Sequence, residues 1–129
     1  MFLSLYRNQN INDMKAILID VKNETICEVQ LDKKNILHSW YKEIGCQMVE
    51  VAHYFNEMDC VMVDEEGLFT MSEDSKFFSV EGGHQPFIGN GLVVGCEPRS
   101  GESANPGISV EEVKALVKFH TLSEVRRMS

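Results

Sequence analysis

The chain has 129 residues, a length that suits one domain and lets folding remove roughly two-thirds of the unfolded chain's surface from water. A hydrophobic fraction of 43% and a charged fraction of 25% are those of a globular protein, and they argue against a disordered or membrane-spanning chain. The net charge of −8, with no basic stripe, argues against direct binding to DNA or RNA, because such binding needs Lys and Arg to displace counterions from phosphates. The apolar opening lacks a basic leader and a cleavage site, so we expect an unexported, cytoplasmic protein.

The first half of the chain predicts a β-hairpin followed by one amphipathic helix. Residues 15–21 are rich in strand-forming types, and residues 25–31 alternate apolar with polar side chains after a short polar turn. Apolar residues then recur at helical spacing after Asp32, a suitable N-cap. Gly45 stands where a left-handed C-cap belongs, so the helix is expected to end there.

The second half predicts further strands and a closing helix. We expect strands at residues 46–55, 59–64, 68–71 and 86–96. Residues 72–83 lack a clear period, and residues 97–107 have the composition of a loop. A capping box at Ser109–Glu112 opens a last helix, whose apolar face is expected to contain Val113, Leu116, Val117 and His120.

Together these elements predict an α+β fold, a mostly antiparallel sheet with two α-helices. The expected order is ββαβββ, then a strand, then a helix. No linker or internal repeat divides the pattern. Residues 1–13 are aperiodic and polar at their end, so we predict an N-terminal extension over 1–13 and a single domain over 14–129.

Several segments, taken in order, follow a known pattern. They are Met14-Lys15-Ala16, the helix ending in Ile44-Gly45 with Val49-Glu50-Val51 after it, the strand and turn at 63–67, the glycine-punctuated run at 88–95, and the closing helix at 109–119. This pattern resembles the family catalogued as domain of unknown function 3846, which comprises small proteins of bacteriophages, mobile elements and their bacterial hosts. The resemblance spans about residues 14–120. It implies a phage-encoded accessory protein in the cytoplasm of a bacterial host, and it brings no activity with it.

The segment at residues 81–86 is the most unusual one in the chain, because it combines two glycines with polar side chains. Gly82 and Gly83 free the backbone to present amide groups, and His84 and Gln85 add polar side chains next to an apolar strand. A plain turn is the alternative, since the segment matches no phosphate-binding fingerprint. We take these four residues as candidate ligand-binding residues, and we add Asn90 and Arg99 from the glycine-rich segments that follow.

The sequence gives no catalytic motif and no metal-binding spacing. The cysteines carry no CxxC pair and are expected to be buried free thiols in a reducing compartment: Cys27, Cys46, Cys60 and Cys96. The four histidines are isolated in sequence. We therefore predict no cofactor, no metal and no catalytic residue, while a small hydrolase or transferase that uses His84 or His53 with Glu81 or Glu50 stays an alternative.

Assembly is suggested by the small number of predicted helices. Two helices leave part of the sheet to be covered, and a symmetric homodimer or higher homo-oligomer is a common way to cover it. Trp40 and Tyr41 lie on the apolar face of the first predicted helix, where core packing is the ordinary role. Because buried Trp and Tyr need partners for their polar tips, we name these two residues as the candidate interface.

These observations favour a non-enzymatic accessory protein of a phage or mobile element that acts by binding. The leading hypothesis is counter-defence by sequestering a small nucleotide-derived signal in the glycine-rich loops. The alternative is an acidic inhibitor that docks on a basic host defence protein, because residues 50–81 hold nine carboxylates against one base, Lys76. Neither hypothesis involves direct contact with nucleic acid or a membrane.

Overall fold

The structure is a computed structural model that describes residues 13–128, except for the side chain of Asp13. The predicted extension therefore lies outside the described residues apart from Asp13, which begins the first strand. The fold is α+β with mostly antiparallel sheets, as the sequence predicts. None of the helices in the described part of the chain is long and apolar enough to cross a membrane.

The larger sheet has six strands and contains the predicted hairpin at one edge. The hairpin strands pair in register from Asp13 opposite Asp32 to Asp20 opposite Thr25. Along the sheet the order is β2 (Thr25–Asp32), β1 (Asp13–Asp20), β7 (Gly91–Cys96), β4 (Asp59–Asp64) and β3 (Val49–Tyr54), with β8 (Ser103–Ala104) paired to β7. All neighbours along this path are antiparallel.

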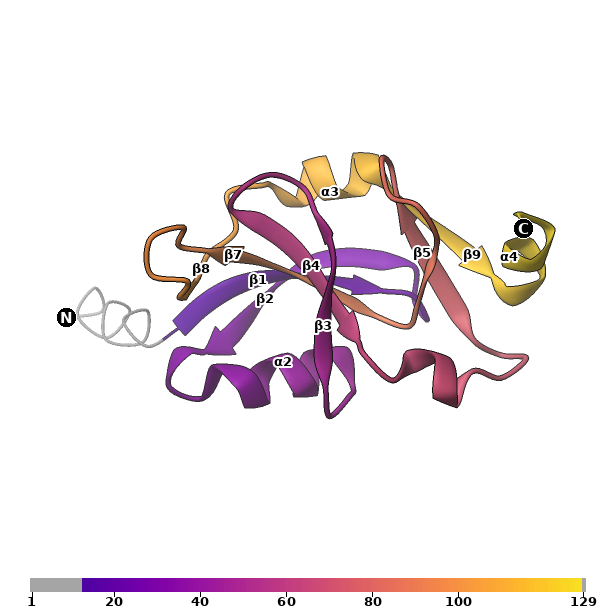
Figure 1. The fold of residues 1–129 in the computed structure, drawn as a ribbon, viewed down its shortest axis with the longest axis horizontal. Coiled ribbons are helices and arrows are strands. Elements are labelled where there is room, and N and C mark those ends of the chain that lie inside the picture. The colour runs from indigo at the N-terminus through magenta and orange to yellow at the C-terminus, as the bar shows by residue number, and fades with distance from the viewer. Residues whose placement is uncertain (1–12, 129) are drawn as a thin grey trace.

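A smaller sheet packs against the larger one, and helices flank both. Its strands, in order, are β6 (Phe87–Ile88), β5 (Lys76–Val80) and β9 (Val117–Thr121). The α-helices of the described residues are α2 (Ile36–Ile44), α3 (Val110–Leu116) and α4 (Leu122–Met128), with short 3₁₀ turns η1 (Lys33–Asn35) and η2 (Gly67–Thr70). Figure 1 shows α2 and α3 on opposite sides of the larger sheet, and α4 next to β9 at the end of the molecule.

Strand alternation divides the core of the larger sheet into two clusters. Successive residues of a strand point to opposite faces, so Ile17, Val61 and Val93 face one way and their neighbours Ala16, Cys60 and Leu92 face the other. The second set packs with Ile44 and Trp40 of α2. The first set packs with residues of the smaller sheet and α3. Both faces of the sheet are thus covered within one chain.

One close contact joins the two sheets. Phe78 of β5 is fully buried, and its ring lies against Gly91 at the start of β7. A Cβ atom at Gly91 would stand 2.6 Å from Cζ of Phe78 and 2.9 Å from Cγ2 of Val61. Only glycine leaves room for the ring at this point, where β7 begins after the chain passes from the smaller sheet to the larger one.

A buried carboxylate ties the loop before α3 to the larger sheet. Asp59 accepts hydrogen bonds from the backbone N–H groups of Gly107 and Ile108, both at 2.9 Å, and from the Asn56 side-chain amide at 3.0 Å. These donors satisfy the carboxylate, which would otherwise be costly to bury. The contact places α3 over the face of the sheet that also receives Phe78.

The structure corrects three expectations in the second half of the chain. Residues 68–71 do not form a strand; the segment is the turn η2, since Gly67 is held against Ile88. Residues 72–83, for which no strand was predicted, contain strand β5, because the polar residues at the start of the segment obscure the pattern of this short strand in the sequence. The expected strand at 86–96 is divided into β6 and β7.

The closing helix is also shorter than predicted. Its capping box is present, with Ser109 accepting from Glu112 N–H and the Glu112 carboxylate accepting from Ser109 N–H. The helix ends at Leu116, and Val117 and His120 lie on strand β9, paired with Val80 and Phe77. Pairing with β5 therefore outweighs the helical pattern, and a third helix, α4, follows.

We expect Gly91→Ala to lower the free energy of unfolding by about 1–3 kcal/mol, because the added Cβ overpacks the contact with Phe78. Phe78→Leu should be destabilising alone but should remove much of that penalty in the double variant, since the ring causes the clash. Urea unfolding measures the stability of the two single variants and the double variant. Gly107→Ala is the control, because its Cβ would meet only an ordinary contact with Asp59 at 3.5 Å. If the changes in unfolding free energy of the two single variants simply add in the double variant, the proposed clash between residue 91 and the Phe78 ring is wrong.

Candidate functional site

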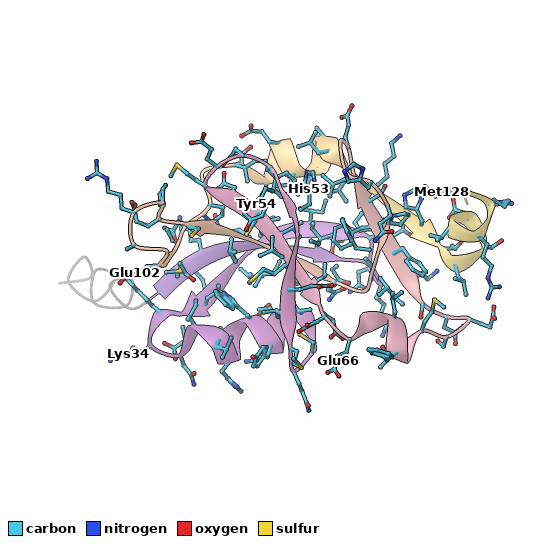
Figure 2. The ribbon with its side chains drawn as sticks, viewed as in Figure 1. Lys34, His53, Tyr54, Glu66, Glu102 and Met128 are labelled. Carbon is cyan, nitrogen blue, oxygen red and sulfur yellow. The ribbon has the colours of Figure 1, made fainter. Side chains whose placement is uncertain are left out.

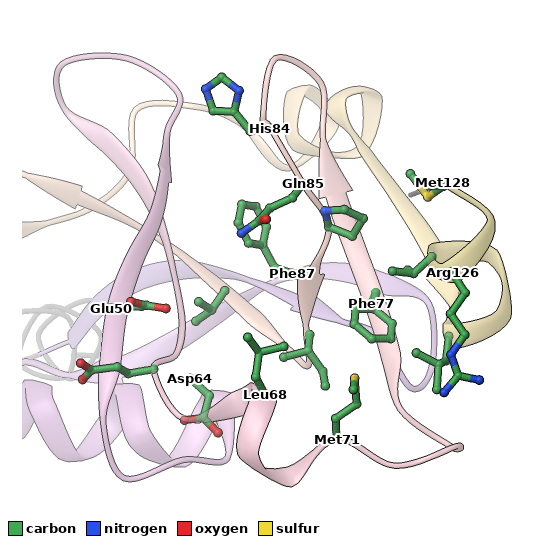
Figure 3. Close-up of a pocket in the computed structure, with 16 residues that line it drawn as sticks. Glu50, Asp64, Leu68, Met71, Phe77, His84, Gln85, Phe87, Arg126 and Met128 are labelled. Carbon is green, nitrogen blue, oxygen red and sulfur yellow. The ribbon is translucent and has the colours of Figure 1, made fainter.

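A groove between the ends of the two sheets contains two of the predicted ligand residues, His84 and Gln85. Its volume is about 580 Å³. Figure 3 shows it open between β3 and β4 on one side and β5, η2 and α4 on the other. It is lined by Glu50, Val63, Asp64, Glu65, Leu68, Met71, Phe77, His84, Gln85, Pro86, Phe87, Ile88, Leu122, Val125, Arg126 and Met128.

The floor of the groove is apolar. Val63 and Phe77 are buried there, and Phe87 and Ile88 of β6 are half-buried beside them. Phe87 also packs on Phe78, with ring centroids 5.4 Å apart and planes tilted by 54°. The floor is thus fixed by the same ring that joins the two sheets.

The groove has one acidic side and one basic group. Glu50 of β3, Asp64 at the end of β4, and Glu65 line it from one side. Arg126 of α4 lies across from Glu50 in Figure 3 and forms a 3.4 Å ion pair with Glu73, both side chains being largely exposed. Exposed pairs of this kind are weak, so Arg126 is available to a ligand that offers a better anion.

The predicted glycine turn forms the upper rim of the groove. Gly82 adopts a positive φ of 89°, and Gly83 N–H donates to the Val80 carbonyl at 2.8 Å, which closes a turn between β5 and β6. The turn carries His84 and Gln85 to the groove lining. The side chain of His53 lies behind the turn, with its Nδ1 3.7 Å from the position of a Cβ at Gly83.

Asn90 and Arg99 do not join this groove. The Asn90 side-chain oxygen accepts from Val21 N–H at 3.0 Å, which ties the start of β7 to the end of β1. Asn90 also lines a separate hollow with Lys22 and Lys76. Arg99 is exposed in the loop between β7 and β8. Figure 2 places Glu102 of that loop at one end of the molecule and Met128, which lines the groove, at the other.

The candidate interface residues lie on α2, away from the groove. Trp40 packs against the cluster under the larger sheet, and its indole Nε1 is buried without a hydrogen-bond partner. Tyr41 is half-buried beside it. Since the smaller sheet and α3 cover the face that an oligomer was expected to cover, the homo-oligomer stays a prediction that rests on Trp40 and Tyr41.

The histidines considered for catalysis do not pair with carboxylates. Neither His53 nor His84 forms a hydrogen bond with Glu50 or Glu81. The one side-chain hydrogen bond that a histidine forms within residues 13–128 joins His120 Nε2 to Ser79 Oγ across β9 and β5, at 2.7 Å. Within the same residues, no three His, Cys, Asp or Glu side chains are grouped to hold a metal ion.

The cysteines are free, as expected, but the expectation that they are buried is wrong for most of them. Cys60 is buried, Cys46 and Cys96 are half-buried, and Cys27 is exposed. Cys27 lies on edge strand β2 next to buried Ile26 and so points to the opposite face. Burial, with Cys96 and Asp59 nearby, raises the pKa of the Cys60 thiol to about 11, so this thiol stays protonated at neutral pH.

Sequence reasoning missed two walls of the groove, the turn η2 and the helix α4. The second carried a recognisable signal. Thr121 and Glu124 form a capping box, with Thr121 N–H donating to the Glu124 carboxylate at 2.9 Å and Glu124 N–H donating to Thr121 Oγ1 at 3.2 Å. The spacing Thr-x-x-Glu indicates a helix start at Thr121, but it was not used because the preceding helix was predicted to extend to His120.

The fold and the groove define a small two-sheet α+β protein with an open groove that has carboxylates on one side. The family described as Domain of unknown function (DUF3846) matches residues 14–118, and the chain belongs to this family. The matched segment runs from β1 into β9 and ends before α4. No curated protein and no solved structure is significantly similar to the chain.

We expect the stability of the protein to depend on Glu124 in acid. The Thr121 N–H and hydroxyl groups first, then His120 and Arg127, lower the pKa of Glu124 below its ordinary value of 4.5. The stabilisation is therefore complete above the unfolded-state pKa and is lost as the pH falls through the lower, folded-state pKa. Glu124→Gln should flatten this part of the curve of urea midpoint against pH.

The control is Glu111→Gln, which removes an 84% exposed carboxylate paired with Lys114 at 3.8 Å. It should leave the acid dependence of the urea midpoint intact. An unchanged curve in Glu124→Gln would contradict the capping role.

Proposed function

We propose that the protein is a non-enzymatic binding protein that takes up a small nucleotide-derived ligand in the groove between its two sheets. The observation that carries the proposal is the combination of an apolar, aromatic floor with a few polar groups at the rim, among them His84 and Gln85. Ligand sites commonly have this composition, in which apolar contact supplies affinity and a few polar groups fix the orientation. The volume of about 580 Å³ lies in the ordinary range for such sites.

The groove chemistry favours one orientation of a nucleotide. A planar base would lie on the floor next to Phe87, since aromatic side chains stack on bases of any sequence. Its ring N–H and amino groups would donate to Glu50 or Asp64, which accept only. A phosphate would face Arg126, on the far side from the carboxylates. The three carboxylates disfavour ligands with several phosphates, so we propose a ligand of low negative charge.

The biological part of the proposal rests on the resemblance to small phage and mobile-element proteins. A chain of this size that holds a nucleotide-derived signal removes it from a host defence pathway by mass action. Sequestration requires affinity and abundance, and it requires no chemical step. The proposed setting is the cytoplasm of a bacterial host, where such signals are made.

The test is a thermal-shift panel of cyclic nucleotides and cyclised ADP-ribose derivatives. A ligand present at one hundred times its Kd stabilises the folded state by about 2.7 kcal/mol, which raises the Tm by several degrees. We expect Gln85→Ala and Glu50→Gln to reduce the shift at a fixed ligand concentration, because both side chains line the groove and are exposed enough for the fold to survive.

Arg99→Ala is the matched control, since Arg99 is a polar residue outside the groove. It should keep the full shift. No shift across the panel would refute the proposal, and so would a shift that Arg99→Ala abolishes while Gln85→Ala preserves it.

A further inference from the structure

The turn η2 carries the two most exposed large apolar side chains of the described residues. Leu68 is 73% exposed and Phe69 is 86% exposed, and Met71 follows them at the surface. We call Leu68, Phe69 and Met71 the η2 knob. Leu68 and Met71 also line the groove, whereas Phe69 does not. Adjacent exposed apolar residues of this size commonly mark an interaction surface.

The knob is held in place from below. Gly67 is buried against Ile88, so closely that a Cβ there would stand 2.5 Å from Cγ2 of Ile88. Phe69 N–H donates to the Glu66 carbonyl at 3.0 Å, and the Thr70 hydroxyl donates to the Gly67 carbonyl at 3.0 Å. With Gly67 anchored inward and the turn closed by these bonds, the next two side chains point outward. Such preorganisation lowers the entropy cost of binding.

Acidic residues surround the knob on both sides in sequence. Residues 64–76 contain five carboxylates, Asp64, Glu65, Glu66, Glu73 and Asp74, and one base, Lys76. Asp64 accepts from Glu66 N–H at 2.9 Å, which fixes the start of the turn. Among the described residues, the ion pair of this segment joins Glu73 to Arg126 of α4 at 3.4 Å, and Lys22 and Lys76 line a hollow beside Gly67 and Thr70. The surface around the knob is therefore apolar at its centre, and carboxylates outnumber bases in the segment that flanks it.

We propose that the η2 knob docks a basic segment of a partner protein, one that offers an apolar pocket or pair of apolar side chains flanked by Lys or Arg. The apolar centre would supply the affinity, and the carboxylates would supply the choice of partner and a fast association rate. A second copy of this chain fits less well, because a two-fold contact would bring the same carboxylates face to face. Phe69, the most exposed residue of the knob, lies outside the groove, whereas Leu68 and Met71 belong to both surfaces.

The experiment selects a random dodecapeptide display library against the intact protein and measures the enriched peptides by fluorescence polarisation. We expect enrichment of peptides with adjacent apolar residues flanked by Lys or Arg. Phe69→Ser should weaken their binding at least about tenfold, as loss of a central apolar anchor does. Glu66→Gln should weaken it less and should reduce its salt dependence.

Leu37→Ser, which changes another exposed apolar residue on α2, is the matched control and should leave the affinity unchanged. Thermal melts confirm that each variant folds, which Phe69→Ser should, given its exposure. Enrichment of neutral or acidic peptides, no enrichment, or equal binding to Phe69→Ser overturns the proposal. A dimer in light scattering that Phe69→Ser dissolves also overturns it, because the occupant would then be a second copy.

Discussion

The contact between Phe78 and Gly91 holds the rest of the architecture in place. It is the tightest packing between the smaller sheet and the larger one at a glycine of β7, and it leaves no room for a side chain at residue 91. The cluster around it contains residues of β1, β4, β7, β9 and α3, so a shift at this point would disturb most of the core. Because protein interiors are close-packed, a single methyl group is enough to produce such a shift.

The groove is a consequence of this contact. Phe78 supports Phe87, and Phe87 with Phe77 and Ile88 forms the floor on which a ligand would lie. The acidic wall comes from the ends of β3 and β4, which the larger sheet positions independently. The remaining wall, α4, lies beyond the segment that matches the family, so Arg126 and Met128 are features of this chain's groove that the family match does not include.

Local signals in the sequence were sufficient where a segment's own chemistry decides its structure. The hairpin of β1 and β2, the Gly45 cap of α2, and the Ser109 capping box belong to this group. The strand β9 does not. Val117 to Thr121 has an apolar spacing compatible with a helix, and only the distant partner β5 makes it a strand. Likewise η2 is a turn because Gly67 meets Ile88, a contact between residues far apart in sequence.

The candidate site was predictable to a similar degree and for the same reason. The turn at Gly82 and Gly83, with His84 and Gln85 after it, could be found from residue types alone. Asn90 and Arg99 were chosen by the same reasoning, yet Asn90 accepts a hydrogen bond from the backbone of Val21 and Arg99 is exposed in the loop between β7 and β8. The carboxylates of Glu50 and Asp64 line the groove because the smaller sheet packs beside β3 and β4, an arrangement that one sequence does not reveal.

Native mass spectrometry tests the central claim, that the inter-sheet groove holds a nucleotide-derived ligand, most directly. The chain would be purified gently from a bacterial host with an active nucleotide-signalling defence, beside Gln85→Trp, in which a large side chain fills the mouth of the groove. The account predicts a wild-type species that exceeds the 14.7 kDa chain by the mass of an ultraviolet-absorbing small molecule, and a variant without it. A bare wild-type chain, or the same adduct on both proteins, would contradict it.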